Sequence, residues 1–350
     1  MGIINFRIVF DKPVYMGGDD VTGKVLLSIT GGETKIRGLK LQITGIITVS
    51  WWEEMEEKSN EGSYDYEEET HIVKAKKVQK EVFYRQQGVV LEKGNHQLTI
   101  GDHEFAFRVP LPDTGIYGTF RSKEKGAVDW EAKCEIDIPW GFNKNVVETI
   151  FVNNLIDLNK HPQSIQPFKD SKQKTFGFLC CKSGPLDLDV NIMKTGFVCG
   201  EEVTLNIQVN NKTNKVLSII VSVFQNTTFK RLRKSAELDV IQKQVVQQCP
   251  PETNETLCHK LKIPLCAPST QNLYGAMDIE YFLQVDGSPD GIGFNVTLKV
   301  PIMIGNVPHT NAFEAITEAN ESSSDAISLL PKGIRSKYPG IPNAKIGADR

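Results

Sequence analysis

The feature that most constrains the fold of this chain is a short motif that occurs twice. In Val14–Thr22 an aromatic residue is followed by a glycine, two acidic residues, valine and threonine, and the same order recurs in Gly196–Thr204. Phe197 stands 182 residues after Tyr15, its counterpart in the first copy. In each copy the aromatic ends a strand, the glycine adopts a backbone conformation that other residues avoid, and the acids occupy a solvated turn. The repeat therefore predicts two related domains in tandem, each of ordinary size.

Alternating apolar and polar residues predict that both domains are all-β. Phe6, Ile8 and Phe10 alternate with Arg7 and Val9, and alternation of this kind bounded by turn residues indicates half-buried antiparallel strands. Further strands are expected at Val21–Ile29, Leu39–Ile43, His103–Val109, Val128–Ile138, Leu186–Ile192, Val203–Val209, Leu217–Phe224, Leu257–Ile263, Met277–Val285 and Gly293–Ile302. Helix is expected only at Asn311–Asn320, with a single turn at Pro268–Leu273. Many short strands with little helix are typical of β-sandwiches.

The repeat and the change in composition along the chain suggest domain boundaries. The same offset of 182 residues lays Leu39 and Leu41 on Val221 and Val223, and at a shorter offset 107–111 resembles 261–265. We interpret residues 1–155 as the first domain, 156–184 as a polar linker, 185–305 as the second domain and 306–350 as a flexible tail. The tail lacks strand periodicity and combines a serine-rich acidic patch with a basic, Gly- and Pro-containing end.

Charge and hydropathy exclude several classes of protein. A formal net charge of −3 over 350 residues argues against a polycationic nucleic-acid binder. No run approaches the ~20 apolar residues of a membrane-spanning helix. The first residues lack the apolar core of a signal peptide, and Phe6 occupies the position where a myristoylation signal has Ser or Thr. We therefore expect a cytoplasmic protein that does not bind nucleic acid.

Cysteines and glycosylation motifs bear on whether the protein is secreted. Seven cysteines, an odd number spread widely over the chain, make a poor disulfide framework for a secreted protein. Asn-x-Ser/Thr motifs would matter only on an exported chain, and they begin at Asn211, Asn226, Asn254, Asn295 and Asn320. A secreted structural β-sandwich protein is thus an alternative, which glycans on the native protein would favour.

The sequence contains no recognisable catalytic set. Its six histidines are scattered, and there is no nucleophile elbow, phosphate-binding glycine loop or His-Glu-x-x-His motif. Cys249, Cys258 and Cys266 with His259 lack the Cys-x-x-Cys spacing that places two zinc ligands together, so we interpret them as packing thiols. We expect no enzyme activity, no cofactor and no metal.

The most highly charged part of the chain is Glu53–Glu69, with nine acidic residues and one lysine. We interpret it as a solvated insertion between two strands, kept open by its own repulsion; the alternative is a loop that selects charged partners. Two basic clusters are candidate contacts for anionic partners, with ordinary surface charge as the alternative. They are Lys74, Lys76, Lys77 and Lys80, and Lys230, Arg231, Arg233 and Lys234.

Several stretches together resemble the alpha-arrestins, the arrestin domain-containing proteins. Residues 6–25 resemble the first hairpin of their N-domain, and 36–44, 94–98, 130–133 and 153–159 are also similar. The most specific match is 174–185, with its Cys-Cys-Lys-Ser-Gly-Pro core, followed by 196–203. The residues of the family pattern expected to be structural are Tyr15, Gly18, Cys180, Cys181, Gly184, Pro185, Phe197 and Gly200.

The resemblance implies a fold and a function. The fold would be two tandem immunoglobulin-like arrestin β-sandwiches with a short irregular C-terminal tail. The function would be that of a non-catalytic cytosolic trafficking adaptor, recruited to the plasma membrane and endosomes, that binds membrane cargo such as receptors and transporters and links it to endocytic or ubiquitin machinery. The basic clusters would then contact cargo tails or an anionic membrane surface. A retromer-type cargo-sorting subunit, which has similar tandem sandwiches, is the alternative within this fold.

The chain departs from the family in one motif. Alpha-arrestins usually carry Pro-Pro-x-Tyr motifs that dock on the WW domains of HECT-type ubiquitin ligases, for which an extended proline-rich segment is suited. Here Pro250-Pro251 is followed by Glu252-Thr253, and the tail offers only Tyr338-Pro339. Recruitment of a HECT-type ligase would therefore require another contact.

Overall fold

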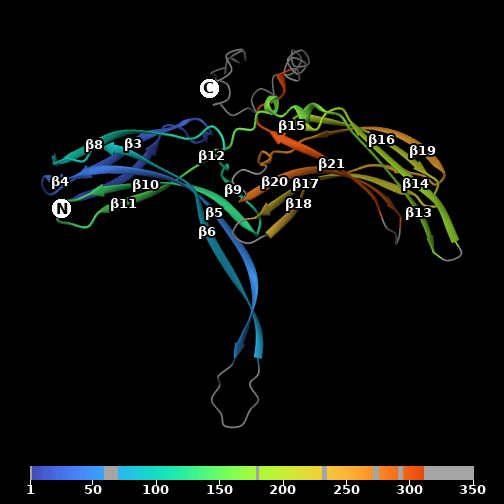
Figure 1. Cartoon of the computed structure of the whole chain (residues 1–350), viewed down its shortest axis with the longest axis horizontal. Helices are drawn as coiled ribbons and strands as arrows, with labels where there is room; N and C mark the ends of the chain where they lie inside the picture. Colours follow the sequence, from blue (N-terminus) through green and yellow to red (C-terminus); the bar gives the residue numbers. More distant parts are fainter. Residues whose placement is uncertain are drawn as a thin grey trace, which may run out of the picture. The chain divides into compact units, whose positions relative to one another are not determined.

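β-Strands make up most of the described chain (Figure 1). The structure, a computed structural model, describes residues 2–58, 70–178, 181–230, 235–270, 276–290 and 295–310. The helical elements that lie entirely within these ranges are two short 3-10 turns, η1 (Leu158–Lys160) and η2 (Pro162–Ile165). The prediction of an all-β fold is confirmed.

The chain divides into two compact units. The first holds the described residues up to Asn154 together with Asn226–Asp239 and Thr270–Glu280. The second holds Leu155–Gln225, Val240–Ser269 and the described residues from Tyr281 onwards. Each copy of the repeated motif lies in its own unit, as the tandem arrangement predicts.

The N-terminal strands form two main sheets and two short pairs. One sheet has the order β1–β3–β8: β1 (Ile3–Phe10), β3 (Asp20–Ile29) and β8 (Gly101–Pro110). The other has the order β11–β10–β5–β6, with β9 paired to β10: β5 (Gly38–Lys58), β6 (Thr70–Leu91), β9 (Phe120–Arg121), β10 (Gly126–Asp137) and β11 (Lys144–Ile150). The short pairs are parallel β2 (Tyr15–Met16) with β12 (Val152–Asn153), and antiparallel β4 (Thr34–Ile36) with β7 (His96–Leu98).

The core of the first unit lies on the apolar faces of these sheets. Alternate residues of β3 and β5, such as Val25 and Leu41, are fully buried, and each such side chain contributes about 1.5–3 kcal/mol. Trp130 of β10 is also fully buried, and its ring packs edge-on against Phe83 with centroids 5.3 Å apart. Its Nε1–H donates to the carbonyl oxygen of Tyr117 at 3.0 Å, so the indole is buried without an unsatisfied donor.

Two further sheets are built from the strands after residue 167. The first has the order β13–β14–β16–β19: β13 (Phe168–Phe178), β14 (Cys181–Ile192), β16 (Glu202–Asn211) and β19 (Thr253–Lys262). The second has the order β15–β21–β20–β17–β18: β15 (Gly196–Val198), β17 (Leu217–Phe229), β18 (Ser235–Cys249), β20 (Met277–Pro289) and β21 (Val296–Gly305). Val203, Leu205 and Ile207 of β16 alternate with polar residues and are fully buried, as the period-two pattern predicts.

Three predictions of secondary structure require correction or extension. β5 continues to Lys58, so Glu53 and Glu54 belong to a strand rather than to an open insertion; residues 59–69 lie outside the described ranges. β13 falls in the stretch interpreted as a linker, where its polar sequence gave no strand pattern. The helical turn at Pro268–Leu273 is wrong for its described part, because Thr270 exchanges backbone hydrogen bonds with Ile279 instead. The helix expected at 311–320 lies outside the described residues.

Candidate functional site

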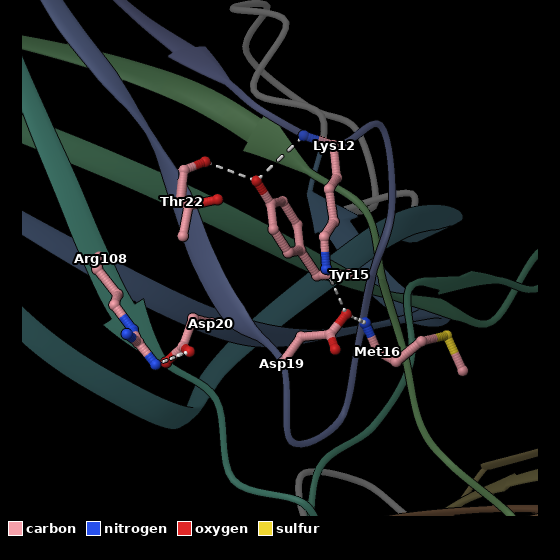
Figure 2. A network of polar contacts seen from close by, with 7 residues as sticks. All are labelled: Lys12, Tyr15, Met16, Asp19, Asp20, Thr22 and Arg108. Carbon is pink, nitrogen blue, oxygen red and sulfur yellow. Dashed lines mark hydrogen bonds and ion pairs between the residues drawn. The ribbon is translucent and has the colours of Figure 1, made fainter. Parts of the chain in front are cut away.

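The first copy of the repeated motif forms a turn between β2 and β3, closed by the carboxylate of Asp19 (Figure 2). The Met16 N–H donates to Asp19 Oδ2 at 3.0 Å, and the Asp19 N–H donates to the Met16 carbonyl oxygen at 2.9 Å. Gly18 has a φ of 83°, a conformation that strains any residue with a side chain. Lys12 Nζ lies 3.3 Å from the same Asp19 oxygen. One carboxylate therefore joins the turn to the residues that precede it.

Tyr15 anchors this turn in the core. Its side chain is 1% exposed, and its hydroxyl donates to the Thr22 carbonyl oxygen at 2.7 Å (Figure 2). The Lys12 N–H donates to the same hydroxyl oxygen at 3.4 Å. Beside the turn, Arg108 of β8 pairs with Asp20 at 2.5 Å, which ties the start of β3 to its neighbouring strand. Tyr15 and Gly18 thus take part in the packing and the backbone conformation of this turn.

The second copy reproduces this turn between β15 and β16. The Val198 N–H donates to Glu201 Oε2 at 3.0 Å, and the Glu201 N–H donates to the Val198 carbonyl oxygen at 3.1 Å. Gly200 has a φ of 87°, and Lys194 forms an ion pair with Glu201. Phe197 is 3% exposed and takes the place of the tyrosine. The repeat identified in the sequence is therefore a repeat of structure, down to individual hydrogen bonds.

The ion pair of Lys194 with Glu201, the first acid of the second motif, was not predicted from the sequence, although a signal for it existed. Each stands 182 residues after Lys12 and Asp19, the ion pair of the first copy. Carrying the offset beyond the nine matched residues would have predicted the second ion pair from the first.

The Gly-Pro pair of the family pattern lies where two strands approach closely. A Cβ on Gly184 would stand 1.8 Å from the Lys212 carbonyl oxygen, so only glycine fits at this point of β14. The Lys212 N–H donates to the Pro185 carbonyl oxygen at 3.0 Å. Cys180 lies outside the described residues, and Cys181, the first residue of β14, is described only in its backbone.

The candidate basic contacts near the N-terminus lie on β6, at the edge of its sheet and along the part that extends beyond it. The ladder between β5 and β10 ends at Val49, next to which the Ser50 N–H donates to the Lys125 carbonyl oxygen, and residues 50–58 of β5 continue the ladder with residues 70–78 of β6. Figure 1 shows this two-stranded part, here named the ribbon, leaving the rest of the sheet. Within it Lys74 stands opposite Glu54, with Nζ and Oε1 3.5 Å apart, and Lys76 stands opposite Trp52. Both side chains of the Lys74–Glu54 pair are more than half exposed, so the pair contributes little to stability.

The four lysines of β6 do not share one face. Successive side chains of a strand point to opposite sides, so Lys74, Lys76 and Lys80 lie on one face and Lys77 lies on the other. The first three are exposed, whereas Lys77 is half-buried. The exposed face also carries Val78, which is 57% exposed. The structure thus brings three of the four candidate residues together on an exposed strand face.

The second basic cluster is represented in the described residues by Lys230 alone. Its ammonium forms an ion pair with Asp278, whose side chain is only 8% exposed. The hydrogen bond to Asp278 raises the pKa of Lys230. Lys230 therefore neutralises a buried carboxylate of its own fold. Arg231, Arg233 and Lys234 lie outside the described residues.

The Pro-Pro sequence forms a tight turn between β18 and β19. Asn211 is fully buried, and its Nδ2 donates to the carbonyl oxygens of Cys249 and Pro250 at 3.3 and 2.8 Å. Glu252 has a φ of 57°, which turns the chain back directly after Pro251. A WW ligand is an extended segment, so this turn does not present one. The buried amide of Asn211 also leaves no room for a glycan at that motif.

The cysteines discussed as zinc ligands do not come together. Cys249 is fully buried, Cys258 is exposed, and Cys266 lies beside Cys199, with their sulfur atoms 3.9 Å apart. Across the described ranges, no three His, Cys, Asp or Glu side chains form a group that could hold a metal ion. The contact between Cys199 and Cys266 had no signal in the sequence, because 67 residues separate them.

No helix in the described part of the chain is long and apolar enough to cross a bilayer.

Both halves of the chain match domains of known proteins. Residues 6–159 match the family model of the arrestin (or S-antigen) N-terminal domain, and residues 182–309 match that of the C-terminal domain. Human arrestin domain-containing protein 4 is 24% identical over 340 residues, which cover 95% of this chain and 77% of that protein. Mouse arrestin domain-containing protein 1 is 22% identical over 334 residues, which cover 94% and 70%.

A third relative shares a smaller part. Human thioredoxin-interacting protein is 22% identical over 217 residues, which cover 61% of this chain and 52% of that protein. The two domain matches together extend over most of the chain, and the repeated turn falls within each of them. The chain is therefore a member of the arrestin family and, within it, an alpha-arrestin.

Proposed function

We propose that this alpha-arrestin is a non-catalytic trafficking adaptor that binds the cytoplasmic tails of membrane cargo, such as receptors and transporters. The observation that carries the proposal is the pair of arrestin domains, matched over 6–159 and 182–309. The adaptor works in the cytoplasm and is recruited with its cargo to the plasma membrane and endosomes. It connects cargo to the endocytic or ubiquitin machinery.

The proposed cargo contact is the exposed face of β6 that holds Lys74, Lys76 and Lys80. β6 is the edge strand of its sheet, so its outer backbone groups can pair with an extended peptide. Lysines two residues apart on a strand face lie about 7 Å apart, a spacing that suits successive acidic or phosphorylated residues of such a peptide. Lys230 is a weaker candidate, because its ammonium is already paired with Asp278.

The experiment follows recruitment of the tagged chain to membranes in cells. Reversal of Lys74, Lys76 and Lys80 to Glu should reduce recruitment at least about tenfold, because three favourable charge contacts become repulsive. Lys77→Glu, on the opposite face of the same strand, should have a much smaller effect. Equal loss in both variants would contradict the assignment to one face.

A second control matches the charge change. Lys35, Lys40 and Lys93 are exposed lysines outside the ribbon, and their reversal to Glu changes the net charge by the same amount. This variant should still be recruited. Thermal unfolding should show that all variants remain folded, and proximity labelling should recover membrane proteins with the wild type and the control but not with the triple variant. Unchanged recruitment of the triple variant would refute the proposed contact.

A link to HECT-type ligases through WW domains is not part of the proposal. The Pro250–Pro251 turn is closed by Asn211 and lacks the tyrosine of a WW ligand. Pull-downs with isolated WW domains should therefore return no binding. Micromolar binding to the chain would overturn this statement and restore the usual route of the family.

A further inference from the structure

Position 199 is where the two copies of the repeated turn differ most in chemistry. The first copy has Gly17 at this position, and the second has Cys199. In the second copy the neighbouring segment, which follows β19, places Cys266 against the turn. The two Sγ atoms are 3.9 Å apart, and the Cys266 N–H donates to Cys199 Sγ at 3.5 Å. As a neutral thiol, Cys199 donates to the Cys266 carbonyl oxygen at 3.4 Å.

This separation is van der Waals contact between sulfur atoms. A disulfide bond requires an S–S distance of about 2.05 Å, so the atoms must approach by about 2 Å, which rotation of one or both side chains can supply. Both cysteines are partly exposed, so a small oxidant can reach them. Cys134 and Cys249 are fully buried, and Cys258 is exposed on the outer side of β19.

The electrostatics give the two thiols different roles. The hydrogen bond from Cys266 lowers the pKa of Cys199; burial opposes this shift, and the backbone N–H groups at the sulfur add to it. The pKa of Cys266 is raised by its hydrogen bond to Cys199 and by burial. Behind Cys266, burial raises the pKa of Tyr281, which therefore stays neutral. This asymmetry favours Cys199 as the attacking sulfur and Cys266 as its partner thiol.

We propose that Cys199 and Cys266 form a dithiol site that hydrogen peroxide converts to a disulfide. The Cys199 thiolate attacks one peroxide oxygen, the O–O bond breaks, and hydroxide leaves, so that Cys199 becomes a sulfenic acid. The Cys266 sulfur then attacks the Cys199 sulfur; the S–S bond forms, the S–O bond breaks, and the departing hydroxide takes up the Cys266 proton. The first hydroxide takes up the proton that Cys199 released to solvent on ionisation. Counted from the dithiol, the protein loses two electrons and two protons, and the peroxide is reduced to two waters. A dithiol reductant reverses the reaction.

The bond would act on one half of the molecule only. It would tie the turn between β15 and β16 to the segment after β19, closing a loop of 67 residues within the second unit. Gly17 gives the first copy no equivalent. Oxidation would therefore stabilise the second unit selectively, by restricting its unfolded chain.

The test uses the reduced full-length chain, treated with hydrogen peroxide, blocked with an alkylating agent and digested without reductant. Mass spectrometry should find the Cys199 and Cys266 peptides joined, with the loss of two hydrogens, and dithiothreitol should separate them. Cys258, in the same digest, should remain alkylated. The oxidised chain should also melt at a higher temperature than the reduced one. Absence of the cross-link, or oxidation of Cys199 to a sulfinic acid without it, would overturn the proposal.

Single substitutions test which cysteine reacts with the peroxide and which then forms the disulfide. With Cys266→Ser the sulfenic acid should persist on Cys199 and be captured by dimedone. With Cys199→Ser the same peroxide dose should leave Cys266 unmodified. Capture at Cys266, or equal capture at both positions, would refute the assigned roles. Thermal unfolding of each variant checks its fold, and the wild-type cross-link tests the site without any substitution.

Discussion

The turn after β2 and the turn after β15 share their backbone hydrogen bonds but differ in the side chains that they bury. In both, a glycine with φ near 85° precedes an acid whose carboxylate accepts from a backbone N–H three residues earlier. The Lys12–Asp19 pair is 47% and 22% exposed, whereas the Lys194–Glu201 pair is 22% and 10% exposed. The comparison shows that the backbone conformation is the common constraint. The environment of the charged pair has diverged.

A second difference lies in the chain that passes beside each turn. In the second copy one residue makes both backbone hydrogen bonds: the Ile263 N–H donates to the Glu201 carbonyl oxygen, and the Ile263 carbonyl oxygen accepts from the Gly200 N–H. In the first copy two residues share these bonds. The Leu111 N–H donates to the Asp19 carbonyl oxygen, and the Pro112 carbonyl oxygen accepts from the Gly18 N–H. A Cβ on Gly17 would stand 3.3 Å from the carbonyl oxygen of Asp113 and 3.4 Å from that of Pro112. The first turn therefore has little space for a side chain at the position where the second carries Cys199.

The largest effect is expected from removing the buried aromatic of either turn. Tyr15→Ala and Phe197→Ala should each lower the free energy of unfolding by about 3–5 kcal/mol, because each leaves a cavity in the core. Chemical denaturation measures the loss, and hydrogen exchange assigns it to the unit that carries the substitution. A large loss from only one of the two would contradict the equivalence of the turns.

Replacement of the lysine should cost more stability in the second turn than in the first. Lys194→Met leaves the Glu201 carboxylate, only 10% exposed, without its cation and should cost about 1–3 kcal/mol. Lys12→Met should cost at most about 1 kcal/mol, because water can solvate Asp19 in place of the lysine. In a double-mutant cycle with Glu201→Gln, the interaction free energy between Lys194 and Glu201 should account for most of the cost of Lys194→Met. Equal costs at both turns would show that the difference in burial has no energetic consequence.

Substitution of the positive-φ glycine should cost about the same stability in the two copies of the turn. Gly18→Ala and Gly200→Ala should each cost about 1–2 kcal/mol, because a Cβ is strained at positive φ. Gly18→Asn and Gly200→Asn are the matched controls and should cost less, since asparagine tolerates this conformation. If alanine and asparagine were equivalent in denaturation experiments, the cost would come from something other than the backbone conformation.

The same comparison explains how much of the fold the sequence could predict. Period-two alternation located most strands, because each has one buried face, as Val203 and Leu205 illustrate. β11, β13 and β18 were missed because they are edge strands whose side chains are mostly half-exposed or exposed, so their pairing leaves little trace in hydropathy. The similarity of 107–111 to 261–265 misplaces the alignment by two residues, since Val109 pairs with Val21 and Leu261 with Val203. A shift of two keeps every side chain on its face, so hydropathy cannot detect it.

The candidate sites were predictable only where strand geometry alone decides them. That Lys77 lies opposite to Lys74, Lys76 and Lys80 follows from the alternation of a strand. The pairing of Lys230 with Asp278 and the contact of Cys199 with Cys266 depend on how distant segments meet. Neither leaves a local pattern. The interpretation of Glu53 and Glu54 as part of an open insertion is wrong because both belong to a ladder, in which Glu53 stands opposite Ala75 and Glu54 opposite Lys74.

The smallest effect is expected from a substitution that makes the first turn resemble the second. Tyr15→Phe removes the hydroxyl that donates to the Thr22 carbonyl oxygen and leaves the ring in place, as in Phe197. Thr22 keeps the hydrogen bond from the Asp11 N–H at 3.1 Å, so its oxygen is not left unsatisfied. The loss should therefore be about 0.5–1 kcal/mol, at the low end for a hydrogen bond. Denaturation compared with Tyr15→Ala separates the hydroxyl from the ring. A loss as large as that of alanine would mean that the hydroxyl, which the second copy lacks, holds the first turn together.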